Sequence, residues 1–355
     1  MQPHWQRVSL TGIFLAFLFT GVSCDSSSLT ITTGSSTGDS GVYKSEDNGG
    51  HWTHKVFVDK VKKKETTIGA VNIRRFLFDP QDSRIVYIIT DGSGIWRTVN
   101  AAEQWKQIFA GGLGDFAIDH RDPNNLAVAS GNTVNRSDDS GTSWLRVYLE
   151  TRPGVGMNSV LFDRSNSKRM LAATSAGDIL VTSDLGATWD VLHRFEGFSA
   201  SRLLQLPSRA LYAVTHNQGL WRSTDQGNTW VNVIEILREK PGAYDVRDIL
   251  FDPAVPNGLI LVTNYGIFRS PDGGETWNEV TLIARPGTAD IKSVAVNPVN
   301  AQELFYAVPG GLYRTKDGGA HWTTLSLPVG HLPTALAIDW YNPSIMYLGV
   351  TKVKK

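Results

Sequence analysis

Three basic side chains occupy one matched position in three segments of this 355-residue sequence. Arg74, Arg247 and Lys292 each lie five residues before the Asp or Asn that ends a short apolar run. Cationic groups brought together bind anions, and the planar guanidinium of Arg suits a carboxylate through two parallel hydrogen bonds. We therefore predict that these side chains bind an anionic ligand or an acidic segment. The alternative is that each pairs with a neighbouring acid such as Asp248 or Asp290.

Carboxylates offer a second chemistry, the hydrolysis of glycosidic bonds. That reaction needs two carboxyl groups separated by about 5 Å, or by about 6.5–9.5 Å, depending on the mechanism. The acids available in predicted loops are Asp115, Glu150, Glu196, Asp245 and Asp290. The sequence does not pair them, so no catalytic residue is assigned and glycoside hydrolysis is retained as the alternative function.

Metal, cofactor and nucleic-acid chemistry are not indicated. The eight histidines lack metal-ligand spacings such as HExxH, and a single cysteine provides no pair. The sequence contains no glycine-rich phosphate loop, so we predict no cofactor and no metal. The formal net charge is zero, so no field of the whole molecule attracts nucleic acid.

The N-terminus predicts export. Residues 1–23 combine a short polar start, an apolar run at 10–19 and small residues before a cleavage point. That run is shorter than the roughly 20 residues of a membrane-spanning helix. The sequence VSC ending at Cys24 resembles the bacterial lipobox, whose cysteine receives a lipid, although Gly21 replaces the usual aliphatic residue. We predict a membrane-anchored lipoprotein of the bacterial cell envelope, with secretion as the alternative, and a flexible Ser/Thr/Gly tether over residues 24–40.

A repeated turn organises the rest of the chain. Tryptophans recur with a mean spacing of 45 residues, and six of them end the pattern Ser/Thr-x-Asp-x-Gly-x-x-Trp. Asp accepts hydrogen bonds from the backbone just beyond it, and Gly adopts a backbone angle that other residues resist. The seventh copy, TVNAAEQW at 98–105, lacks both the Asp and the Gly. The six complete copies contain Asp47, Asp139, Asp184, Asp225, Asp272 and Asp317, followed by Trp52, Trp144, Trp189, Trp230, Trp277 and Trp322.

This pattern resembles the Asp-box, or BNR repeat, of sialidases, sortilin-type receptors, xyloglucan-cleaving glycosidases and photosystem II assembly factors. The resemblance implies a β-propeller in which the box is a structural turn at the outer edge. Short apolar strands with turn signals at regular intervals agree with an all-β fold. The N-terminal unit supplies only the box hairpin, about 41–57, and the C-terminus only two strands, 334–339 and 345–350. We predict a seven-bladed β-propeller over residues 41–355, with its closing blade shared between the two ends.

Function is then expected on the face of the ring opposite the repeated turns. That face is formed by the turns between the second and third strands and by the links between blades, and loops on a rigid scaffold usually carry function. The longest link between blades, about 55–71, adds Lys62, Lys63 and Lys64 to the candidate binding residues. The chain looks most like the photosystem II assembly-factor type of propeller, which implies a non-catalytic, membrane-tethered binding or assembly protein. Its expected partner on this face is a protein, a glycan or another anionic molecule. The sialidase Phe/Tyr-Arg-Ile-Pro motif is absent, since the nearest sequence is IRRF at 73–76.

Overall fold

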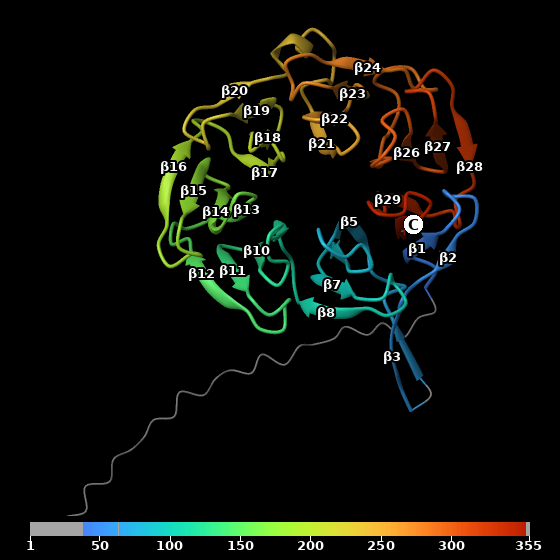
Figure 1. The fold of residues 1–355 in the computed structure, drawn as a ribbon, viewed down its shortest axis with the longest axis horizontal. Coiled ribbons are helices and arrows are strands. Elements are labelled where there is room, and N and C mark those ends of the chain that lie inside the picture. The colour runs from blue at the N-terminus through green and yellow to red at the C-terminus, as the bar shows by residue number, and fades with distance from the viewer. Residues whose placement is uncertain (1–37, 63, 353–355) are drawn as a thin grey trace, which may run out of the picture. The chain divides into compact units, whose positions relative to one another are not determined.

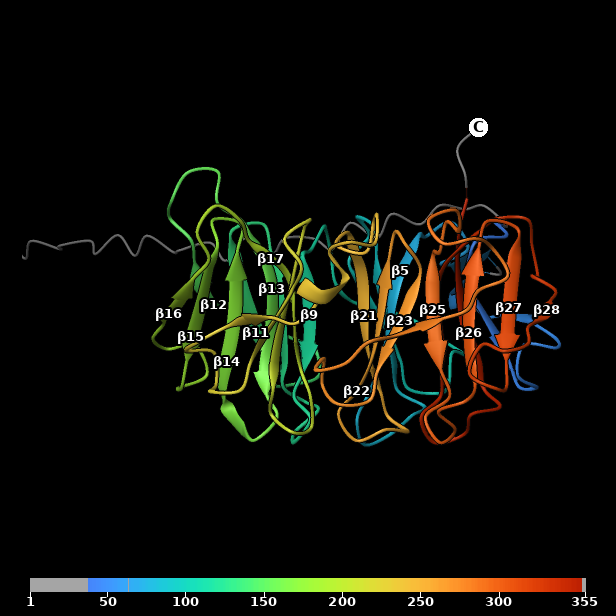
Figure 2. The same ribbon diagram turned by 90° about the horizontal axis from the view of Figure 1, so that it is seen from above.

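The computed structural model describes residues 38–62 and 64–352, and these residues form a ring of seven four-stranded antiparallel sheets (Figure 1). The seven-bladed β-propeller predicted from the repeat is therefore confirmed. The predictions for the export signal at 1–23, for Cys24 and for Lys63 fall outside the described residues, as does the tether up to residue 37. Seen from the side, the blades stand next to one another in a flat disc (Figure 2).

Six blades each consist of four consecutive strands. The first three contain β5 (Ile73–Phe78), β6 (Val86–Thr90), β7 (Ile95–Thr98) and β8 (Lys106–Phe109); β9 (Asp115–Ile118), β10 (Leu126–Ser130), β11 (Thr133–Ser137) and β12 (Leu145–Leu149); and β13 (Met157–Asp163), β14 (Asn166–Thr174), β15 (Asp178–Thr182) and β16 (Asp190–Arg194). The next three contain β17 (Ala200–Gln205), β18 (Leu211–Thr215), β19 (Leu220–Ser223) and β20 (Val231–Asn232); β21 (Val246–Asp252), β22 (Gly258–Thr263), β23 (Ile267–Ser270) and β24 (Asn278–Val280); and β25 (Ser293–Val296), β26 (Leu304–Val308), β27 (Gly311–Thr315) and β28 (Thr323–Leu325).

The closing blade joins the two ends of the described chain. Its strand order is β2-β1-β30-β29, with β1 (Gly41–Ser45) and β2 (Thr53–His54) from the beginning, and β29 (Leu332–Ile338) and β30 (Met346–Thr351) from the end. Strand β1 pairs with β30 in antiparallel register from Gly41↔Val350 to Ser45↔Met346. The predicted shared blade is thus confirmed, and the pairing removes the open edges that a linear array of sheets would leave.

The hydrophobic core lies between neighbouring blades. The second strand of each blade is covered on both faces, so sequences such as VYIIT in β6 and LYAVT in β18 are buried throughout. Tyr87 of β6 packs on Phe116 of β9 with ring centroids 5.2 Å apart, which joins the first two blades. Each blade therefore buries its apolar faces only when both neighbours are present.

The repeated turn forms the hydrogen bonds that its sequence predicts. In one copy, Asp184 Oδ1 accepts from the backbone N–H of Thr188 at 2.9 Å, and the Thr182 hydroxyl accepts from the backbone N–H of Gly186 at 2.9 Å. Gly186 has φ +91, and a Cβ there would lie 2.7 Å from Val147 of the preceding blade. The indole N–H of Trp189 donates to the Val147 carbonyl at 3.0 Å. The turn thereby ties two blades together, in agreement with the predicted structural role.

The degenerate seventh copy forms the same turn with other residues. Asn100 Oδ1 accepts from the backbone N–H of Gln104 at 3.0 Å, as the Asp does elsewhere. Ala102 takes the place of the Gly with φ +73. The indole N–H of Trp105 donates to the Lys55 carbonyl at 2.9 Å. An amide oxygen and an alanine therefore reproduce the turn without the signature residues.

The long link between the closing blade and β5 contains strands that the sequence did not predict. Residues 57–67 form a hairpin of β3 (Phe57–Val61) and β4 (Lys64–Thr67), which extends outward from the ring (Figure 1). The remaining element is a short 3-10 helix at Glu235–Leu237. Among the described residues, no helix is long and apolar enough to cross a membrane.

Candidate functional site

The first strand of each blade lines a channel at the centre of the ring. At the end where these strands begin, Arg74, Arg247 and Lys292 all line one cavity of about 640 Å³. We call this end the channel mouth. The structure thus brings together the three side chains that the register of the sequence placed at a matched position. They come from β5, from β21 and from the residue just before β25.

Two further arginines line the same cavity and were missed by the sequence reasoning. Arg75 follows Arg74 in β5, and Arg202 lies at the corresponding position of β17. Both lie four residues before the position that follows their strands, Asp79 and Leu206, whereas the sequence comparison used only the position five residues before it. The backbone N–H of Leu206 donates to Ala210 in the same way that other strands use their terminal Asp or Asn. This backbone turn sets the register of the first strand in that blade. The sequence SRLLQLPSR indicates the turn only weakly.

Three carboxylates partly neutralise the mouth. Arg75 contacts Asp115 at 2.5 Å, and Arg202 pairs with Asp248. Asp290, which lies beside the cavity, accepts from Lys292 at 2.8 Å and from Arg247 at 3.1 Å. The Lys292 contact is the main reason that the pKa of Asp290 is lowered.

The predicted alternative of local ion pairs therefore holds for two of the three residues first proposed. Arg74 instead donates to the Gly114 carbonyl at 2.8 Å and forms no ion pair within the described residues. Burial in the channel wall lowers the pKa of Arg74. Five cations against three carboxylates leave two excess positive charges at the mouth.

Polar contacts at this level join every blade to the next. They hold the first strands in a closed circle, so the mouth is rigid before any ligand arrives. In order around the ring, the contacts are Arg75 to Asp115, Ser159 Oγ to Asp115 at 2.5 Å, Leu203 N–H to Ser159 Oγ at 2.9 Å, Arg202 to Asp248, Arg247 to Asp290 at 3.1 Å, Ser293 Oγ to the Pro333 carbonyl at 3.1 Å, and Thr334 Oγ1 to the Ile73 carbonyl at 2.5 Å.

The lysines of the long link are placed elsewhere. Lys62 and Lys64 are exposed on the β3–β4 hairpin and are not among the residues that line the channel. Because the hairpin extends away from the ring, these two lysines do not join Arg74, Arg247 and Lys292 (Figure 1). The hairpin lysines, which are close together in the sequence, therefore lie apart from the basic residues of the channel mouth, which come from different blades.

The carboxylates considered for hydrolysis are mostly held by donors. Arg152 holds the pKa of Glu150 at about 2, and the pKa of Asp290 is also lowered. Asp115 accepts from both Arg75 and Ser159, and Asp245 accepts from the amide of Asn264. A general acid needs the opposite shift, toward a raised pKa. The last of the five, Glu196, is exposed. Within residues 38–62 and 64–352, no group of three or more His, Cys, Asp or Glu side chains is arranged to hold a metal ion.

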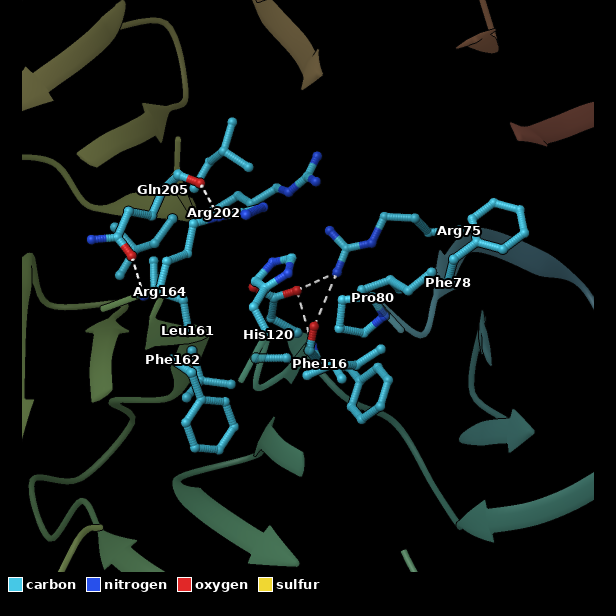
Figure 3. A pocket seen from close by; sticks show the side chains of 17 residues that line it. Arg75, Phe78, Pro80, Phe116, His120, Leu161, Phe162, Arg164, Arg202 and Gln205 are labelled. Carbon is cyan, nitrogen blue, oxygen red and sulfur yellow. Dashed lines mark hydrogen bonds and ion pairs between the residues drawn. The ribbon is translucent and has the colours of Figure 1, made fainter. Parts of the chain in front are cut away.

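A second cavity, of about 240 Å³, adjoins the first toward the other end of the channel. Arg75, Asp115 and Arg202 contribute to both cavities. Figure 3 shows Arg75 reaching toward the next blade, and His120 lines the same cavity. Most of the other residues that line it are apolar, such as Leu77, Pro80 and Leu161.

Comparisons with known proteins recognise the architecture. No protein-family model matches the chain, and no curated protein matches it. The GH74 xyloglucanase from Xanthomonas campestris superposes with a TM-score of 0.64 at 19% identity, covering 79% of this chain and 51% of that one. The GH74 enzyme from Niastella koreensis gives 0.64 at 16% identity, with 83% and 52% covered.

A protein of similar length shares the fold as well. The structure of YCF48 bound to D1 peptide superposes with a TM-score of 0.59 at 17% identity, covering 80% of this chain and 94% of that one. By contrast, the present chain spans about half the length of the two GH74 structures. At identities below 20%, these likenesses concern the fold alone, that of a seven-bladed β-propeller.

Proposed function

We propose that this chain is a binding propeller whose channel mouth holds an acidic segment of a protein partner. The observation that carries the proposal is the excess of two positive charges on a closed circle of polar contacts. Arg74, which has no carboxylate partner within the described residues, is free to bind one from a ligand. Arg247 can exchange the exposed Asp290 for a ligand carboxylate at little cost, because exposed ion pairs contribute about 0–1 kcal/mol.

Binding of a labelled peptide tests this proposal. The probe is a fluorescent peptide of alternating Asp and Gly residues, and the comparison peptide carries Asn in place of Asp. We expect the Asp peptide alone to bind, with an affinity that falls as salt rises, because exposed charges are screened. Loss of two charged hydrogen-bonding groups in Arg74→Gln/Arg247→Gln should weaken binding at least about tenfold.

The hairpin provides a matched control. Lys62→Gln/Lys64→Gln removes an equal number of positive charges, two, from the β3–β4 hairpin. This variant should bind the Asp peptide with an affinity within about twofold of the wild type. If the hairpin variant loses as much affinity as the mouth variant, binding follows net charge and the proposed site is wrong. Equal binding of both peptides to the wild type would also contradict the proposal.

Glycoside hydrolysis has less support. The GH74 likeness concerns the fold, and neighbouring donors lower the pKa of Glu150 and of Asp290, the opposite of what a general acid needs. Incubation with xyloglucan tests the alternative. Release of oligosaccharides that is abolished in Asp290→Asn or Glu150→Gln would establish an enzyme and overturn the binding proposal.

We also propose that the mature chain is an exported lipoprotein attached to a membrane through Cys24, as its N-terminal sequence predicts. A lipid anchor would hold a binding disc near membrane partners through a flexible tether. Cys24→Ser should move the protein from the membrane fraction to the soluble fraction of an expressing bacterium. Unchanged fractionation of this variant would contradict lipidation.

A further inference from the structure

The channel end opposite the mouth has a different chemical character. The position that follows the Asp, Asn or Leu at the end of each first strand lies at this opening, and most of its residues are apolar or cyclic. Around the ring the seven residues are Pro80, His120, Arg164, Pro207, Pro253, Pro298 and Trp340. Two neighbouring blades, those of β9 and β13, therefore place a histidine and an arginine side by side in an otherwise apolar rim.

His120 and Arg164 both line the cavity of about 240 Å³. Pro80 and aliphatic residues such as Leu161 are among the residues that line it. Figure 3 shows the ring of Phe162 directed away from Arg164 and His120. Neither His120 nor Arg164 lines the larger cavity, which extends from the mouth to Pro253, Pro298 and Trp340 at this rim. The smaller cavity therefore has its own polar groups at one end and an apolar interior beside them.

Arg164 is oriented by the neighbouring blade but is not neutralised. Its backbone N–H donates to Oε1 of Gln205 at 2.7 Å, and its Nε donates to the Gln205 carbonyl at 3.1 Å. No carboxylate of the described residues forms an ion pair with it, and no acceptor is bonded to its two terminal nitrogens. Burial lowers the pKa of Arg164 to about 10, which reflects the cost of holding an uncompensated charge in the channel wall.

His120 is a neutral neighbour. Enclosure by the channel walls, with a smaller contribution from Arg164, lowers its pKa to about 4. The imidazole is therefore uncharged at neutral pH and can donate one N–H while accepting at the other ring nitrogen. Arg75 and Arg202 also line the cavity, and each is paired with a carboxylate, Asp115 and Asp248 respectively.

We propose that this end of the channel binds a small organic anion, namely a carboxylate carried on an apolar ring or chain. The terminal nitrogens of Arg164 match the two oxygens of a carboxylate, and the imidazole of His120 supplies a further donor. The apolar part of the ligand lies against Pro80 and the aliphatic residues of the cavity lining. Such an anion offsets the cost of the half-buried, unpaired guanidinium, which a neutral ligand cannot do.

Titration calorimetry with benzoate tests this site. Benzamide, which has the same shape without the charge, is the comparison ligand. We expect benzoate to bind the wild type with a dissociation constant below about 1 mM, and benzamide at least about tenfold more weakly, since a charged hydrogen-bonding pair is lost. Arg164→Met, which keeps the apolar stem, should weaken benzoate binding at least about tenfold.

Two controls locate the site. Arg121, which directly follows His120, is exposed and donates to the Ser165 carbonyl outside the cavity. Arg121→Met should therefore leave benzoate binding unchanged. The mouth variant Arg74→Gln/Arg247→Gln should also bind benzoate normally, which separates this site from the proposed peptide site. If Arg164→Met does not fold, the ring resonances of His120 in the wild type provide a second measurement, and they should shift on benzoate addition. The proposal is wrong if benzoate does not bind, if benzamide binds equally, or if Arg164→Met binds like the wild type.

Discussion

The ion pair between Arg75 and Asp115 supports both the stability of the ring and the charge of its mouth. Asp115 accepts from Arg75 at 2.5 Å, from the Ser159 hydroxyl at 2.5 Å and from the backbone N–H of Phe116 at 2.9 Å. The carboxylate is 6% exposed and the guanidinium 23% exposed. Asp115→Asn would remove the charge and keep the shape, leaving a half-buried guanidinium without its counter-ion.

We expect this variant to lose about 3 kcal/mol of unfolding free energy, because breaking a buried pair on one side costs about 3–5 kcal/mol. An unfolding entropy of about 2.1 cal/mol/K per residue amounts to about 0.6 kcal/mol/K for a folded unit of about 300 residues. The melting temperature should therefore fall by about 5 °C. Because the mouth then has one more uncompensated positive charge, the acidic peptide should bind about two- to fivefold more tightly.

Urea unfolding and peptide binding on three variants check both effects. Arg75→Met/Asp115→Asn removes both charges and should recover at least about half of the lost stability, since replacing a whole buried pair is often neutral. Asp290→Asn, at an exposed pair, should cost about 1 kcal/mol or less. The reasoning is refuted if Asp115→Asn is as stable as the wild type, or if the double variant is less stable than the single one.

Two further predictions concern the closure of the ring and its repeated turns. A Cβ on Gly349 of β30 would lie 2.6 Å from Ile73 of the first complete blade, so Gly349→Ala should cost about 1–3 kcal/mol through overpacking, measured by urea unfolding. Gly330→Ala, where a Cβ meets no atom within 4 Å, is the control and should change stability by less than about 0.5 kcal/mol; similar effects of both substitutions would contradict a tightly packed closing seam. The hydroxyl and backbone donors of the turn lower the pKa of Asp184 to about 2, below its value in the unfolded chain, so its contribution is present above about pH 4 and is lost as pH falls toward 2. The variant to test replaces three such aspartates by Asn, namely Asp139, Asp184 and Asp225. Its free energy of unfolding, measured from pH 5 to pH 3, should depend less steeply on pH than that of the wild type. An unchanged slope would contradict a stabilising role of the charged aspartates.

Much of the fold could be predicted from local patterns. The last two strands were expected at 334–339 and 345–350, and they occur at Leu332–Ile338 and Met346–Thr351. The turn pattern fixes where consecutive strands of a blade reverse, and those strands pair with one another along the chain. The count of turns and the incomplete units at the two ends therefore gave the number of blades and their closure.

The site was predicted only in part. The matched positions of Arg74, Arg247 and Lys292 placed them at one cavity, because a constant register repeats the same geometry in each blade. Arg75 and Arg202 were missed because the comparison used only the position five residues before the Asp or Asn, and both lie one residue later. The lysines of the long link were expected on the binding face, but the link folds into a hairpin that extends outward.

The sequence by itself determined the repeat and the seven blades, because these depend on turns and apolar runs that recur about every 45 residues. The incomplete units at the two ends then indicated that the last blade is shared. Only the tertiary structure decided which charges meet. Arg75 pairs with Asp115, Arg202 pairs with Asp248, and Arg164 donates a hydrogen bond to Gln205. Each partner is about 40 residues away and belongs to the adjacent blade. Contacts between blades depend on how two sheets pack at the channel, and no local pattern along the chain specifies that packing.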